Sequence, residues 1–155
     1  GLWLEIVTLL IPGFNDSEDE LRKLTEFVAR VSPDIPWHVT AFHGDYKMNE
    51  PRDTTPEDLL RAAEIGRQAG LRYIYPGNLP GMVGEWEDTH CPQCRETLIR
   101  RYGYLIQEYR LTSEGRCPTC AAEIPGRWSS GFDGQITSNP FLPHKRSRLF
   151  TITSR

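Results

Sequence analysis

The sequence has no long apolar run and only four cysteines among its 155 residues. No stretch approaches the roughly 20 consecutive apolar residues that cross a bilayer as a helix, and no short apolar segment with a small-residue cleavage site precedes the first predicted strand. These absences argue against membrane-embedded and secreted proteins, so we expect a cytoplasmic one. The hydrophobic content of 38% suffices for one domain with a core, or for a small domain with an appendage.

A strongly basic composition is also lacking, since the formal net charge is -3. Residues 1–88 carry 8 basic and 16 acidic side chains, residues 89–128 carry 6 and 4, and residues 129–155 carry 4 and 1. An acidic main part gives no footprint for nucleic-acid binding. We expect residues 129–155, which lack periodicity and end in a basic cluster, to be a disordered tail.

Three short apolar runs, at residues 3–11, 37–42 and 71–75, predict β-strands. The first is rich in leucine and β-branched residues with little alternation, which is typical of a parallel strand covered on both faces. Pro76 and Gly77 are predicted to end the third strand.

Two amphipathic stretches between these runs predict helices. Ser17 and Glu20 form a capping box ahead of apolar residues at helical spacing. Thr55 followed by Pro56 marks the start of the second helix, and Gly70 its left-handed end. The resulting strand–helix order predicts three parallel, adjacent strands joined by right-handed crossovers. Such a sheet cannot close a barrel or protect both edges, so we expect it to be the second half of a larger unit.

All four cysteines fall in two matching C-P-x-C motifs, arranged C-x2-C-x22-C-x2-C. Duplicated turns of this kind are typical of a tetrahedral four-thiolate metal site, and the spacing indicates a zinc ribbon formed by Cys91, Cys94, Cys117 and Cys120. Redox dithiols or disulfides are the alternative, and a rubredoxin-type iron takes the same four sulfur ligands as zinc. Arg95 and Ala121 follow the second cysteine of each motif, where glycine would ease the turn, so we expect strain there.

Several segments carry a family resemblance, in this order: LWLEIVTLLIPGFNDSEDEL, PWHVTAFHGDYKM, AGLRYIYPGNLPG, and the paired cysteine motifs ending in IPGRW. Residues 1–128 thereby resemble the C-terminal part of the radical SAM enzyme of the AmmeMemoRadiSam system, a relative of pyruvate formate-lyase activating enzyme. The resemblance implies a partial (β/α)6 barrel with a 4Fe-4S cluster and S-adenosylmethionine (SAM), which generates a 5′-deoxyadenosyl radical. It also implies AMMECR-type and Memo-type proteins as partners.

One departure from that family decides what this chain could do alone. The family binds its cluster through C-x3-C-x2-C, and no such motif occurs here. We therefore expect residues 1–88 to be the C-terminal half of the barrel and residues 89–128 the zinc-ribbon-like module. The N-terminal half-barrel, with the cluster, would come from the same gene or from a separate chain. Without it the chain should be inactive.

Three residues are candidate SAM contacts. His43 follows the second strand, where the resemblance implies a SAM-contacting histidine. Glu5 is a carboxylate within an apolar run and should face a polar lumen, where it contacts the ligand or forms a rim salt bridge with an arginine. Asn78, at the end of the third strand, is a ligand candidate or only a turn residue. His38 is predicted to be a hydrogen-bonded core residue on the opposite strand face from His43.

Two other functions are compatible with the sequence. The module could dock a protein or a nucleic acid through its arginines, which are Arg95, Arg100, Arg101 and Arg110. An iron-loaded ribbon could instead transfer electrons.

Overall fold

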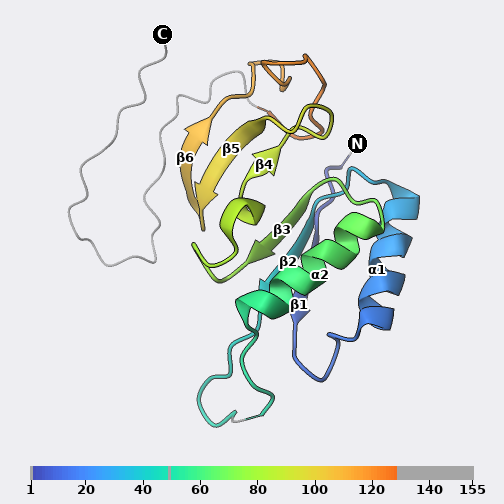
Figure 1. Cartoon of the computed structure of the whole chain (residues 1–155), viewed down its shortest axis with the longest axis vertical. Helices are drawn as coiled ribbons and strands as arrows, with labels where there is room; N and C mark the ends of the chain where they lie inside the picture. The colour runs from blue at the N-terminus through green and yellow to red at the C-terminus, as the bar shows by residue number, and fades with distance from the viewer. Residues whose placement is uncertain (1, 49, 129–155) are drawn as a thin grey trace, which may run out of the picture.

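The computed structural model describes residues 2–48 and 50–128 (Figure 1). The predicted disordered tail, residues 129–155, lies outside the described residues. Within the described ranges, no helix combines the length and the apolar content that a membrane span requires.

The first unit is a three-stranded parallel sheet with two helices (Figure 1). Its elements, in chain order, are β1 (Ile6–Leu10), α1 (Glu18–Val31), β2 (Trp37–Ala41), α2 (Pro56–Gln68) and β3 (Ile74–Gly77). The strands pair in sequential order β1-β2-β3, with Val7 beside His38 and His38 beside Tyr75. The predicted order and parallel pairing are confirmed.

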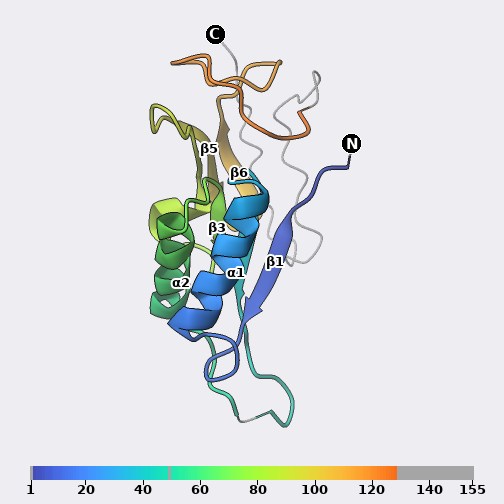
Figure 2. The same cartoon turned by 90° about the vertical axis from the view of Figure 1, so that its right-hand side faces the viewer.

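Both helices cover the same face of this sheet (Figure 2). The side chains of β2 alternate, so that Trp37, Val39 and Ala41 are buried against the helices while His38 and Thr40 point to the other face. Leu21 of α1 and Leu59 of α2 are fully or almost fully buried in the same core. The core of this unit therefore lies between the sheet and the helices.

The opposite face of the sheet carries exposed apolar side chains. Val7 is 67% exposed and Leu9 is 44% exposed, and both lie on β1. The prediction that residues 3–11 form a strand covered on both faces is therefore wrong for the described residues. Sequential strands with right-handed crossovers send both helices to one side, so the apolar run meets a helix on one face only.

The third strand differs from its prediction in position. It spans Ile74–Gly77 instead of residues 71–75, so Pro76 and Gly77 lie inside it. Because β3 pairs only with β2 in its sheet, it is an edge strand, where the missing N–H of proline breaks no ladder.

The predicted helix start and end signals are confirmed, except that Ser17 and Glu20 form only half of the predicted capping box, because the Glu20 carboxylate accepts from the Ser17 hydroxyl instead of the Ser17 N–H. The Ser17 side chain caps α1 by accepting from the backbone N–H of Glu20, and Thr55 forms a full capping box with Asp58 at the start of α2. Gly70 follows α2 with a φ of 99°, a left-handed conformation that glycine adopts without a steric penalty.

Replacing Asp58 with asparagine should lower the free energy of unfolding by about 1–2 kcal/mol near pH 7. Asp58 is 8% exposed and accepts from both terminal nitrogens of Arg52 and from the backbone N–H of Thr55. The Arg52 guanidinium, with Thr55, holds the pKa of the Asp58 carboxyl well below its usual value of about 3.9. This stabilisation is present above that usual pKa and is lost as the pH falls through the lower, folded-state pKa.

Urea unfolding of the wild type and the variant at pH 7 and pH 3 tests this prediction. The difference between the two proteins should shrink at the lower pH. Asp19→Asn is the control, because the Asp19–Lys23 pair is exposed to solvent and should contribute much less to stability. A difference for Asp58→Asn that is the same at both pH values would contradict the ionic explanation.

The second unit is a small antiparallel sheet that follows a short 3-10 helix. Its elements are η1 (Gly84–Glu87), β4 (Thr89–His90), β5 (Thr97–Tyr102) and β6 (Leu105–Tyr109), with strand order β4-β5-β6. The buried side chains Leu98, Ile99 and Ile124 pack with Cys91 and Cys117 in its core. Tyr73, which directly precedes β3, belongs to the same cluster, so the two units are packed together.

Candidate metal centre and adjoining cavity

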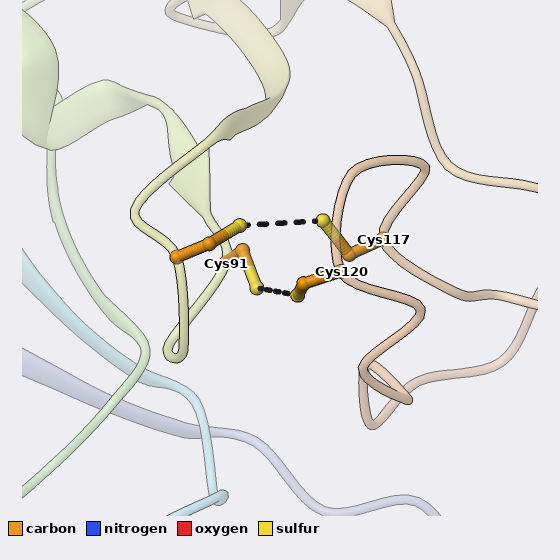
Figure 3. A group of neighbouring side chains, drawn as sticks. Cys91, Cys117 and Cys120 are labelled. Atoms are coloured by element: carbon orange, nitrogen blue, oxygen red, sulfur yellow. Dashed lines mark hydrogen bonds between the residues drawn. The ribbon is translucent and has the colours of Figure 1, made fainter.

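The four cysteines of the chain converge on one point of the second unit (Figure 3). The Sγ atoms of Cys91 and Cys120 lie 3.6 Å apart, as do those of Cys94 and Cys117, and all four lie within 4.8 Å of one another. Four sulfurs placed tetrahedrally at about 2.3 Å from one ion would lie about 3.8 Å apart. The spacing therefore fits a single metal ion at the centre of the cluster.

Both cysteine turns have the same backbone structure. The N–H of Arg95 donates to the carbonyl of Cys91, and the N–H of Ala121 donates to the carbonyl of Cys117, at 3.0 and 2.9 Å. Arg95 and Ala121 have φ angles of 64° and 60°, the left-handed conformation that favours glycine. The strain predicted at these two positions is confirmed, and it persists because each turn must aim two sulfurs at one point.

The thiol pKa values of the cluster shift in opposite directions. The backbone N–H of Glu96 lowers the pKa of Cys94 and that of Ala122 the pKa of Cys120, but desolvation and neighbouring sulfurs outweigh both effects and raise the two pKa values. Cys91 and Cys117 are buried, whereas Cys94 and Cys120 are exposed. Burial opposes ionisation of Cys117, yet the backbone N–H groups of Cys120 and Thr119 donate to its sulfur, and the pKa of its thiol falls to about 7. A low thiol pKa suits a metal ligand, because metals bind the thiolate form.

The alternatives to a single metal ion fit the geometry less well. The sulfurs are nearly twice as far apart as the roughly 2.05 Å of a disulfide, and all four cysteines are free. A 4Fe-4S cluster places four irons between its cysteines and so needs a wider cage than a single ion does. Zinc and a single iron both accept this set of four sulfurs.

A cavity of about 540 Å³ lies between the open face of the sheet and the second unit. On the sheet side, the Glu5 carboxylate accepts from Trp3 Nε1 at 2.7 Å and lies 2.9 Å from His38 Nε2. The hydrogen bond from Trp3, together with the His38 partner, outweighs desolvation and lowers the pKa of Glu5. The His38 ring stacks on Tyr75, with the ring centres 5.2 Å apart.

The second unit supplies the opposite wall of this cavity. Arg101 of β5 donates to Thr89 Oγ1 at 2.7 Å, and the same oxygen lies 2.9 Å from the Tyr75 hydroxyl. The Arg101 guanidinium also lies over the Tyr75 ring, 5.5 Å from its centre. Contacts among Arg101, Thr89 and Tyr75 therefore link the second unit to the sheet along one side of the cavity.

The structure places the three candidate SAM contacts at different points. Glu5 and Asn78 both line the cavity, whereas His43 does not. Glu5 directly precedes β1 and pairs with His38 and Trp3. Asn78 has a φ of 68° and donates to the carbonyl of Ala41 at 3.3 Å, so it turns the chain and still faces the cavity.

His43 lies beyond the carboxyl end of β2, and its side chain is 76% exposed. Its Nδ1 lies 2.6 Å from Asp53, whose other carboxylate oxygen accepts from the N–H of Gly44. The Thr54 hydroxyl donates to the carbonyl of Leu10, the last residue of β1, and accepts from the N–H of Phe42, which directly follows β2. Thr54 therefore holds this loop against the ends of both strands. His43 is thus held in place at the strand ends and remains open to solvent.

Sequence reasoning missed His38, Tyr75 and Arg101 as cavity residues. His38 has a hydrogen-bonding partner as predicted, but it lies on the open face and not in the core. The available signal was the position of His38 next to Trp37 in a strand, because successive side chains of a strand point to opposite faces. The sequence carried no comparable signal for Arg101. The register of β5 and β6 shifts between Arg100 and Arg101, and such a bulge changes the direction of the side chains.

Two of the four arginines considered for docking, Arg100 and Arg110, lie beside carboxylates. Arg100 lies 3.6 Å from Glu108 and 4.0 Å from Asp88. Arg110 pairs with Glu96 and lies 3.8 Å from Glu108. These ion pairs offset two of the four positive charges that would face a nucleic acid.

Comparisons with known proteins give one relative and no family. No family model matches the chain, and no solved structure matches it. The uncharacterized protein MJ0808 of Methanocaldococcus jannaschii is 36% identical over 126 residues, which cover 80% of this chain and 37% of the relative. The chain therefore spans little more than a third of the length of this relative.

Proposed function

We propose that the chain is the C-terminal, metal-binding part of a radical SAM enzyme that resembles the glycyl-radical enzyme activases. The parent reaction would be reductive cleavage of SAM to a 5′-deoxyadenosyl radical at a 4Fe-4S cluster. The observation that carries this proposal is the one-sided sheet, with both helices on one face and a cavity on the other. AMMECR-type and Memo-type proteins are the partners to test, because the sequence resemblance points to them.

The strand order is that of a barrel segment, and one βαβαβ half of a doubly wound sheet has the same order. Doubly wound sheets reverse their strand order and so place helices on both faces. Here the order β1-β2-β3 runs in one direction, and right-handed crossovers keep both helices on one side. In a barrel the helices form the outside and the other face lines the interior. Exposed Val7 and Leu9 would then become interior side chains.

This chain does not fit the 4Fe-4S cluster by itself. All four of its cysteines belong to the compact site, whose spacing suits one ion. In the proposal the cluster is held by a segment outside this chain, and the relative, of which the matched residues cover 37%, has room for such a segment. Four thiolates leave a zinc ion no open position, so zinc would act structurally.

The residues present fit a SAM contact best at the carboxyl ends of the strands. His43 follows β2 and Asn78 follows β3, at the edge where α/β folds bind their ligands. Glu5 lies farther away, at the amino end of β1, and reaches the ligand only through the cavity. His43 is therefore the candidate with the clearest test.

The proposal is tested by joining the front half of the resembling enzyme to this chain under anaerobic conditions. The joined protein should form 5′-deoxyadenosine from SAM with dithionite, and residues 1–155 alone should form none. His43→Ala should weaken SAM binding up to about tenfold, which is the loss of one hydrogen bond. Lys47→Ala, on the same loop, is the control and should bind SAM normally.

Two results would contradict this proposal. Turnover by residues 1–155 alone would show that no further segment is needed. A joined protein that folds and carries its cluster, yet forms no 5′-deoxyadenosine, would remove the family assignment. Unchanged SAM affinity in His43→Ala would remove His43 from the site.

A further inference from the structure

We propose that the cavity between the open face of the β1-β2-β3 sheet and the second unit binds a small anionic ligand. The carboxylate or phosphate group of that ligand would lie on Arg101. This site goes beyond the proposed function, since it requires neither SAM nor an iron–sulfur cluster. Its volume of about 540 Å³ lies within the range of small-molecule sites.

Arg101 is positioned in advance for an anion. Its Nη1 donates to Thr89 Oγ1 at 2.7 Å and to the carbonyl of Glu87 at 3.4 Å, and its guanidinium rests over Tyr75. Among residues 2–48 and 50–128, no carboxylate oxygen lies within 4.0 Å of its nitrogens. A guanidinium fixed in a cavity without a carboxylate partner is suited to a carboxylate or a phosphate.

Each oxygen of the two carboxylates that line the cavity already has a hydrogen-bonding partner. Glu5 has one oxygen on Trp3 Nε1 and the other on His38 Nε2. Glu87 accepts the N–H of Gly81 on one oxygen and the N–H of Gly103 on the other. The hydrogen bond from Trp3 and the His38 partner have the larger effects on the pKa of Glu5, and the charge of Arg101 lowers it further from beyond ion-pair distance. The Arg101 nitrogens therefore remain available to the anionic group of a ligand.

A second group in the same wall also has no partner. The Tyr73 side chain is 4% exposed and lines the cavity, and its hydroxyl has no hydrogen-bond partner within the described part of the chain. A buried hydroxyl without a partner is unfavourable, but protein atoms enclose this oxygen and Tyr73 also borders a second cavity, so the ligand contact is assigned to Arg101 alone.

The rest of the wall suits an apolar or aromatic body on the ligand. Trp3 and Trp128 line the cavity from opposite units, and the stacked rings of His38 and Tyr75 form part of its surface. Apolar and aromatic walls with a few placed charged groups are typical of small-molecule sites, and Arg127 lines the cavity together with Arg101. The site therefore predicts a ligand with an anionic group at one end and a flat apolar part at the other.

Binding is tested on the full, metal-loaded chain with four probes: phenyl phosphate, benzoate, phenol and benzylamine. Calorimetry and quenching of tryptophan fluorescence measure affinity, because Trp3 and Trp128 line the cavity. Phenyl phosphate or benzoate should bind at least tenfold more tightly than phenol, and benzylamine more weakly still. The order of the two anions identifies which group the site takes.

Variants at two neighbouring positions locate the effect. Arg101→Gln should weaken the anionic probes at least tenfold and leave phenol unchanged, whereas Arg101→Lys should retain most of the preference for anions. Arg100→Gln is the matched control, because Arg100 faces Glu108 and Asp88 outside the cavity. It removes the same charge and should leave binding unchanged.

Three outcomes would overturn the proposal. These are equal affinity of the wild type for phenol and phenyl phosphate, no binding of either anion, and equal losses in Arg100→Gln and Arg101→Gln. If Arg101→Gln loses its metal, the wild-type probe series and Arg101→Lys decide the matter. SAM and reductant are absent from these measurements, so their failure would leave the radical SAM proposal standing, and the reverse also holds.

Discussion

Replacing Cys91 and Cys117 together with serine should abolish metal binding and unfold residues 89–128. These two buried cysteines, one from each turn, are fully or almost fully enclosed in the core of the module. Metal binding and folding are coupled in small modules of this type, where structural zinc contributes on the order of 10–16 kcal/mol. The surrounding core has few large apolar side chains to replace that contribution.

The change is followed by metal content and by amide hydrogen exchange. The double variant should lose its bound metal and the exchange protection of β5 and β6, while α1 and α2 stay protected. Gln93→Ala, inside the first turn but not a ligand, should keep both the metal and the protection. Stoichiometric zinc in the double variant would rule out the four-cysteine site.

Loss of the module should also remove the cavity, since Thr89 and Arg101 both belong to it. In the double variant we therefore expect no binding of the anionic probes. The metal acts on the cavity through the fold of β4 and β5 and not through contact with the ligand.

Replacing Trp37 with alanine should destabilise the α/β unit by about 3–5 kcal/mol. Trp37 is fully buried on β2, and its indole Nε1 donates to Thr8 Oγ1 at 2.9 Å. It packs so closely on α2 that a Cβ added at Gly66 would come within 2.7 Å of its ring. A loss of this size is a large fraction of the stability of a small unit.

Chemical unfolding followed by the helical circular dichroism signal measures this loss. Phe27→Ala is the control, because Phe27 is an aromatic residue of α1 that is 60% exposed and should change stability by less than about 1 kcal/mol. Equal effects of the two substitutions would mean that the core does not lie between the helices and β2.

Local signals explain why much of the fold could be predicted from the sequence. The caps at Ser17 and Thr55, the left-handed Gly70 and the duplicated cysteine turns each depend on residues within a few positions of one another. The cluster of four cysteines could be predicted from the spacing of the cysteines, and the strain at Arg95 and Ala121 from their position after each motif. Features that depend on neighbours in sequence are the ones that pattern analysis captures.

The rest depends on packing between distant segments. The open face of β1 could not be recognised from an apolar run, because exposure is set by where the two crossover helices lie. The cavity joins His38 of β2 to Arg101 of β5, and the register shift beside Arg101 breaks simple alternation. Asn78 and Glu5 can be recognised as candidates because a polar residue stands out beside apolar strands, whereas no such contrast marks Tyr75 within its apolar run.

X-ray absorption of the purified protein, prepared without added metal, tests the central claim most directly. A closed four-thiolate site predicts about one zinc per chain with four sulfur neighbours at about 2.3 Å. Nitrogen or oxygen neighbours near 2.0 Å, or a metal–metal contribution from an iron–sulfur cluster, would contradict a single ion held by Cys91, Cys94, Cys117 and Cys120.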